Sequence, residues 1–226
     1  MEDRAAPEVH PISIEKAKEL MAGDLADVYR DILRKCCAPI YWFDRKRKDS
    51  RILNNGTVTF VQTPERLLGV TAAHVLNEYM VEAKKTDLGV HIWDAEIGDL
   101  SDRIIDISDK YDLATFCLDE GVMTSLGKES QPLANWPPQP PQEGRGIMLA
   151  GFPAVERQEK DDSVEFGLFT ALVIARTVTD VQITWLIDPE AQLVNARVQP
   201  PPLLYGIGGA SGGPLVSWLE SESHIA

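Results

Sequence analysis

Apolar residues recur at steps of three and four between residues 13 and 37, which is the period of a helix with one buried face. Gly23-Asp24 interrupts this pattern, and Asp24 is a residue type that caps a following helix. The pattern predicts two short amphipathic helices in an N-terminal helical extension, residues 1–50. Two interpretations stay open: the helices pack on the main domain, or they dock a partner or form a dimer.

Short segments rich in β-branched and aromatic residues follow, with turn residues between them. This alternation is typical of a β-barrel or a β-sandwich. A short helix is predicted after Thr71-Ala72-Ala73-His74. The predicted strands are Thr57–Val61, Leu67–Thr71, Val90–Trp93, Ile104–Ile107, Leu113–Leu118, Ile147–Phe152, Phe166–Ile174 and Val181–Ile187.

A proline-rich stretch divides these strands into two groups. Residues 132–141 hold five of the fifteen prolines of the chain, and such a run continues neither a helix nor a strand ladder. We therefore expect an extended connector at residues 132–144. It would join a first β domain, residues 51–131, to a second, residues 145–226.

Composition narrows the classes of partner. The 226 residues carry a formal net charge of −13, which disfavours nucleic acid because phosphate contacts need clustered Lys and Arg. No apolar run approaches the ~20 residues of a membrane span, and the start lacks the order of a secretory signal, so no membrane partner is expected. Cys36, Cys37 and Cys117 give neither a disulfide framework nor a zinc spacing. We expect a cytoplasmic protein or a processed chain.

A run of small residues surrounds one serine near the end of the chain. Residues 206–215 read Gly-Ile-Gly-Gly-Ala-Ser-Gly-Gly-Pro-Leu. Small neighbours let the backbone turn sharply around Ser211, expose its hydroxyl, and can direct the N–H groups of Gly209 and Ser211 to one point. That arrangement is an oxyanion hole, although a glycine-rich run taken alone is more often an ordinary tight turn.

Two further residues complete a known chemical set. His74 follows an apolar strand where a helix is expected to begin, and Asp112 opens the strand Leu113–Leu118. Each alone is most simply a structural residue. Together with Ser211 they supply a base, an orienting acid and a nucleophile in the order His, Asp, Ser, which occurs on chymotrypsin-like barrels and not on subtilisin or α/β-hydrolase folds.

On these motifs the chain resembles the trypsin/chymotrypsin-like serine peptidase family, in a disulfide-free, non-secreted form. The motifs are Thr-Ala-Ala-His at 71–74, Asp-Leu-Ala at 112–114 and Gly-Ala-Ser-Gly-Gly-Pro at 209–214. The resemblance covers residues 52–218 and implies two perpendicular β-barrels with the active site between them. The expected fold class is therefore mainly β: a two-barrel trypsin-like fold with an N-terminal helical extension and an incomplete C-terminal barrel.

The resemblance also implies residue roles. Ser211 would attack a peptide carbonyl, His74 would take and later return the proton, and Asp112 would orient the imidazole. The N–H groups of Gly209 and Ser211 would bind the oxyanion. This implies a serine endopeptidase that hydrolyses polypeptides through an acyl-enzyme, with no metal or cofactor. His74 is expected within hydrogen-bonding distance of both Asp112 and Ser211.

The chain departs from the family pattern in two ways. Val75 and Ala210 stand where secreted members have Cys and Asp, which fits a reducing compartment and argues against activation by N-terminal cleavage. Only 15 residues follow Ser211, whereas the family has further strands there. We expect a fragment with a missing C-terminal segment, or a partner that supplies the strands of the second barrel. The alternative function is a peptidase-like binding or regulatory module, inactive in this truncated form.

Overall fold

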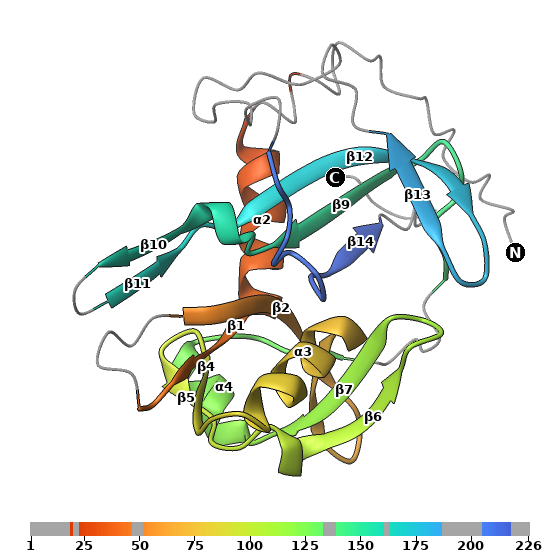
Figure 1. Ribbon diagram of the computed structural model, residues 1–226. Coiled ribbons are helices and arrows are strands. Elements are labelled where there is room, and N and C mark those ends of the chain that lie inside the picture. The colour runs from red at the N-terminus through yellow and green to blue at the C-terminus, as the bar shows by residue number, and fades with distance from the viewer. Residues whose placement is uncertain are drawn as a thin grey trace, which may run out of the picture.

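The computed structural model describes residues 19, 23–46, 52–132, 139–160, 163–186 and 205–217. Over these residues the protein is mainly β, as the sequence predicts, and its long strands pair in antiparallel sheets. Figure 1 shows the two larger sheets in the lower and the upper half of the view, with helix α2 (Asp24–Cys36) beside the upper one. Within the described residues, no helix is long and apolar enough to cross a membrane.

The first sheet has eight strands in the order β5-β4-β1-β2-β3-β7-β6, with β8 paired to β2 in parallel. Predicted strands lie in β2, β3, β6 and β7, and a fifth overlaps β4. The bounds are β1 (Cys37–Asp44), β2 (Ile52–Gln62), β3 (Leu67–Thr71), β4 (Leu88–Ile92), β5 (Ala95–Glu96), β6 (Ile104–Ser108), β7 (Leu113–Leu118) and β8 (Gln131–Pro132).

The strand β1 was not predicted. Helix α2 ends at Cys36, and the chain continues directly as β1 between β2 and β4, so the first sheet begins upstream of residue 51. Residues 37–42 are all buried. A strand covered on both faces lacks the alternation of apolar and polar residues that reveals a strand in sequence.

Two helices pack against the first sheet: α3 (Ala73–Ala83), where a helix was predicted, and α4 (Glu120–Leu126). A short 3₁₀ turn, η1 (Ser101–Arg103), precedes β6. Together they enclose one apolar core. Its largest fully buried side chains are Trp42, Tyr79, Phe60, Phe116, Ile40, Leu76, Ile92, Leu100 and Val58.

The second sheet has the order β13-β12-β9-β14, and a separate two-stranded hairpin pairs β10 with β11. A 3₁₀ turn, η2 (Ala154–Glu156), leads into the hairpin. Most of the predicted connector and residues 218–226 lie outside the described residues. The bounds are β9 (Gly146–Gly151), β10 (Arg157–Lys160), β11 (Ser163–Phe166), β12 (Phe169–Val178), β13 (Ile183–Leu186) and β14 (Leu215–Ser217).

Helix α2 packs on the second sheet rather than standing apart. Leu33 is fully buried in a cluster with Met148, Ala150 and Phe152 of β9 and the residue that follows it. Tyr29, one turn earlier, packs against the same cluster. The described part of the predicted helical extension therefore belongs to the main body, while the first predicted helix lies outside the described residues apart from residue 19.

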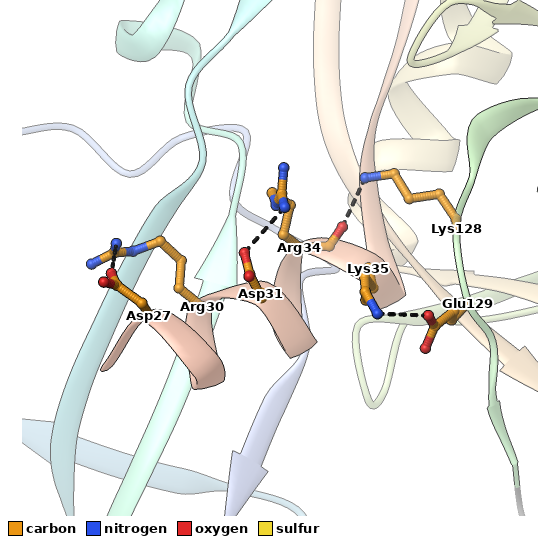
Figure 2. Close-up of polar contacts among 7 residues, drawn as sticks. All are labelled: Asp27, Arg30, Asp31, Arg34, Lys35, Lys128 and Glu129. Atoms are coloured by element: carbon orange, nitrogen blue, oxygen red, sulfur yellow. Dashed lines mark hydrogen bonds and ion pairs between the residues drawn. The ribbon is translucent and has the colours of Figure 1, made fainter. Parts of the chain in front are cut away.

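The carboxyl end of α2 is tied to the segment that follows α4 (Figure 2). The Lys128 ammonium donates to the carbonyl of Arg34 at 2.7 Å, and the N–H of Glu129 donates to the carbonyl of Lys35 at 2.9 Å. These bonds satisfy two carbonyls that a helix end leaves without partners, and the ammonium complements the negative end of the helix dipole. The Lys35–Glu129 ion pair beside them is exposed and contributes little.

We expect Leu33→Ala to lower the free energy of unfolding by about 2–5 kcal/mol, because it leaves a cavity between α2 and β9. Ile32→Ala is the matched control, since the Ile32 side chain is 44% exposed and its truncation changes that free energy by about 0.5 kcal/mol or less. Urea unfolding followed by circular dichroism measures both. Equal effects of the two substitutions would contradict this packing of α2.

His91 of β4 lies between two aromatic rings in the first sheet. The imidazole centroid is 5.4 Å from the rings of both Tyr41 and Phe43. Its Nδ1 is buried and has no hydrogen-bond partner among the described residues. A charge at this position would be poorly solvated, so the neutral imidazole is favoured.

The pKa of His91 is lowered, first by burial. Glu96 and Asp94 act in the opposite direction, and Arg45 adds to the lowering. The unfolded chain therefore binds a proton at a higher pH than the folded one, so His91 reduces stability as the pH falls below about 6.5. We expect the melting temperature of the wild type to fall more steeply between pH 7.5 and pH 5 than that of His91→Phe. Parallel pH profiles of the two proteins would refute this role.

Candidate active site

His74 and Asp112 come together because β3 pairs with β7. The register places Thr71, the last residue of β3, opposite Ala114 of β7, so the residues just after β3 face those just before β7. His74 is the second residue of α3, which begins directly after this strand. Asp112 closes the turn before β7 with φ 48°, a left-handed conformation that Asp tolerates better than most residues.

The Asp112 carboxylate accepts two hydrogen bonds from His74. Its Oδ2 lies 2.8 Å from the imidazole Nδ1, and its Oδ1 accepts from the backbone N–H at 3.0 Å. Burial raises the pKa of Asp112, but the hydrogen bonds from the backbone and side chain of His74 outweigh it, and the pKa is lowered overall. A charged carboxylate at this distance favours the proton on Nδ1, which leaves Nε2 as an acceptor.

A second bond joins the same two segments. Asn77, one turn after His74 on α3, donates from Nδ2 to Oδ1 of Asp109 at 2.9 Å. Asp109 begins the turn that ends at Asp112. This pair ties the aspartate turn to the histidine helix. No sequence signal marks this pair, because Asn in a helix and Asp in a turn are too common to indicate a contact between them.

Ser211 lies in the serine loop, residues 206–214, directly before β14. Its carbonyl accepts from the N–H of Thr57 in β2 at 2.9 Å, which places the loop against the first sheet. Ser211 and Asp112 line one cavity of about 390 Å³. The other lining residues are Thr59, Val70, Thr71, Ala72, Tyr111, Leu113, Gly212, Gly213 and Pro214.

The expected contact of His74 with Asp112 is present, whereas among the described residues His74 and Ser211 form no hydrogen bond. The three residues nevertheless belong to adjoining segments, because Ala72, two residues before His74, lines the cavity that holds Ser211. Both the His74 and Asp112 side chains are about half exposed. A substrate can therefore reach the pair from solvent.

The N–H groups of Gly209 and Ser211, the expected oxyanion donors, have no competing acceptor within the described residues. Neither donates a hydrogen bond there. The carbonyl of Gly208 accepts from the N–H of Ala154 at 2.7 Å, and that of Ala210 accepts from the N–H of Gly213 at 3.0 Å. In a trans peptide the carbonyl and the N–H point in opposite directions, so these bonds also fix the directions of both free N–H groups.

Glycine is required at two positions of the serine loop. Gly209 has φ +95° and Gly212 has φ +88°, both in the region that side chains avoid. A Cβ at residue 212 would lie 2.2 Å from the carbonyl oxygen of Thr57. The small residues seen in the sequence are therefore needed both for the turn and for close packing against β2.

A second hollow of about 590 Å³ begins at His74 and follows the outer face of α3. Its lining is apolar at Trp42, Leu53 and Val81 and carries two carboxylates, Glu78 and Glu82. In the described part of the chain, no three His, Cys, Asp or Glu side chains gather in a way that could hold a metal ion.

No model of a known protein family matches the chain, and no curated protein matches it.

Proposed function

We propose that the protein is a serine endopeptidase of the trypsin/chymotrypsin type, in which His74, Asp112 and Ser211 hydrolyse peptide bonds. The observation that carries the proposal is that the Asp112 carboxylate accepts hydrogen bonds from both the backbone N–H and the ring Nδ1 of His74. Such an arrangement fixes the ring and its tautomer at once, as a general base requires. Asp112 also lines the cavity that contains the nucleophile candidate, Ser211.

In the first half of the reaction, Nε2 of His74 takes the proton of the Ser211 hydroxyl as Oγ attacks the peptide carbonyl carbon. The carbonyl oxygen becomes an oxyanion and accepts hydrogen bonds from the N–H groups of Gly209 and Ser211. The imidazolium then gives its proton to the leaving amine as the C–N bond breaks, which leaves an acyl ester on Ser211. Water attacks this ester by the same steps in the second half, and the carboxylic acid product is released.

The proposal includes the two-barrel architecture. The eight-stranded sheet, with α3 and the turn before β7, is assigned to the first barrel, and the sheet that contains β14 is assigned to the second. The support is that His74 and Asp112 lie next to β3 and β7 of the first sheet, whereas the serine loop leads into the second. The substrate is a polypeptide, and the reaction takes place in the cytoplasm.

A fluorophosphonate probe tests the nucleophile, because it phosphonylates activated serines without needing a matched peptide sequence. Incubation with the folded full chain is expected to add one phosphonyl group on Ser211. Tandem mass spectrometry must separate Ser211 from Ser217, six residues further along, which serves as the internal control for ordinary serines. Labelling of neither residue in the folded protein, or equal labelling of both, would overturn the assignment.

A further inference from the structure

Two threonines of β2 hold the backbone of the serine loop. The hydroxyl of Thr57 donates to the carbonyl of Gly209 at 2.9 Å, and the hydroxyl of Thr59 donates to the carbonyl of Gly212 at 2.9 Å. Between these bonds, the N–H of Thr57 donates to the carbonyl of Ser211 at 2.9 Å. Three carbonyls of the loop are thus bound by one strand of the other sheet.

The Thr57 hydroxyl both donates and accepts a hydrogen bond. It donates to Gly209 and also accepts the N–H of Phe152 at 2.9 Å, and a hydroxyl has only one proton to donate. The carbonyl of Phe152 in turn accepts from the side chain of Asn55 at 2.9 Å. Thr57 is fully buried, so water cannot replace these bonds when the hydroxyl is lost.

The same residue connects the serine loop to the strand that leads to His74. The hydroxyl of Thr71, three residues before His74, donates to the carbonyl of Thr57 at 2.7 Å. A continuous chain of buried and partly buried hydrogen bonds therefore runs from the loop through β2 to the end of β3. Such a chain fixes the distance between two segments more tightly than apolar packing alone, because each bond is directional.

We propose that Thr57 is a positioning residue for the oxyanion hole, with Thr59 supporting it. The Ala154–Gly208 bond fixes the peptide before Gly209, and the Thr57 hydroxyl fixes the peptide after it. The peptide after Gly209 carries the N–H of Ala210, which donates to the carbonyl of Ile207 at 2.9 Å, so this bond and the Thr57 hydroxyl together hold that peptide. Gly209 at φ +95° has no side chain to restrict it, so loss of the hydroxyl loosens the loop between the two oxyanion donors and displaces the N–H of Ser211 relative to that of Gly209. This inference rests on the proposed function, because an oxyanion must form for its donors to matter.

The test compares Thr57→Val with Thr57→Ser. Valine keeps the shape of threonine and removes the hydroxyl, whereas serine keeps the hydroxyl. The readouts are the maximal rate of inactivation by the fluorophosphonate and the probe concentration at half that rate. We expect Thr57→Val to lower the maximal rate on the order of 10²-fold at an unchanged half-saturating concentration, since displaced oxyanion donors weaken the transition state. We expect Thr57→Ser to stay within about threefold of the wild type.

Equal rates for the valine and serine variants, or a change confined to the half-saturating concentration, would overturn the inference. If Thr57→Val does not fold, as judged by its melting curve, Thr59→Val and Thr59→Ser are compared instead. The inference is supported if Thr59→Val lowers the maximal inactivation rate, by less than is expected at Thr57, and Thr59→Ser restores it. Equal rates for the two Thr59 variants reject the inference. The wild type separates this inference from the proposed function. Failure to label wild-type Ser211 refutes the proposed function. Normal labelling of the wild type, together with equal inactivation rates of the valine and serine variants, refutes only the role of Thr57.

Discussion

Replacement of Ser211 by alanine is expected to lower peptide-bond hydrolysis on the order of 10⁶-fold, to the rate that oxyanion binding and substrate positioning provide without a nucleophile. The substitution removes one hydroxyl, which forms no hydrogen bond within the described residues. The free energy of unfolding should therefore change by about 0.5 kcal/mol or less. Hydrolysis of fluorescein-labelled casein at neutral pH, together with a urea unfolding curve, measures both quantities.

The matched control is Ser217→Ala, which removes a hydroxyl from β14 on the same segment and is expected to leave the hydrolysis rate unchanged. His74→Ala should approach the loss seen in Ser211→Ala, and the double variant should be no slower than Ser211→Ala. Residues that act as one unit show this lack of additivity, because removing either one already disables the step. A casein-hydrolysing Ser211→Ala protein, purified free of other peptidases, would contradict the mechanism.

The strands that could be predicted are those with one covered face or a clear turn at each end. In β7 the buried residues Ala114, Phe116 and Leu118 alternate with Thr115 and Cys117, and this alternation is visible in the sequence. In β1 the residues from Cys37 to Trp42 are all buried, and the preceding helix runs into it without a turn. The hairpin of β10 and β11 is largely exposed and polar, so it offers no apolar pattern to detect.

The site was predictable only where chemistry demands an unusual residue type or spacing. The glycines make the serine loop recognisable in the sequence, and the positive φ angles of Gly209 and Gly212 explain why glycine is needed there. Thr57, by contrast, is an ordinary β-branched residue in a strand. Its role depends on the placement of β2 against a loop about 150 positions later in the chain, which no local pattern encodes.

Asp112→Asn is expected to lower the hydrolysis rate about 10⁴-fold at neutral pH, with the fold retained. An asparagine side chain has one acceptor oxygen, but Asp112 accepts from both the backbone N–H and the Nδ1–H of His74. If the amide oxygen keeps the backbone bond, the amide NH₂ faces Nδ1 and stabilises the tautomer with its proton on Nε2. That tautomer cannot take the proton of Ser211. Asparagine also tolerates φ 48° at this position, so the turn is preserved.

The turn itself provides the control, because Asp109 can be changed in the same way. In Asp109→Asn the amide oxygen can still accept from Asn77, so the turn stays tied to α3 and the hydrolysis rate should fall by about threefold or less. Casein hydrolysis and the rate of fluorophosphonate labelling should rank the two variants alike. Equal losses in both would mean that residue 112 acts only by holding the turn. A loss confined to Asp112→Asn assigns the effect to the proton on Nδ1 of His74.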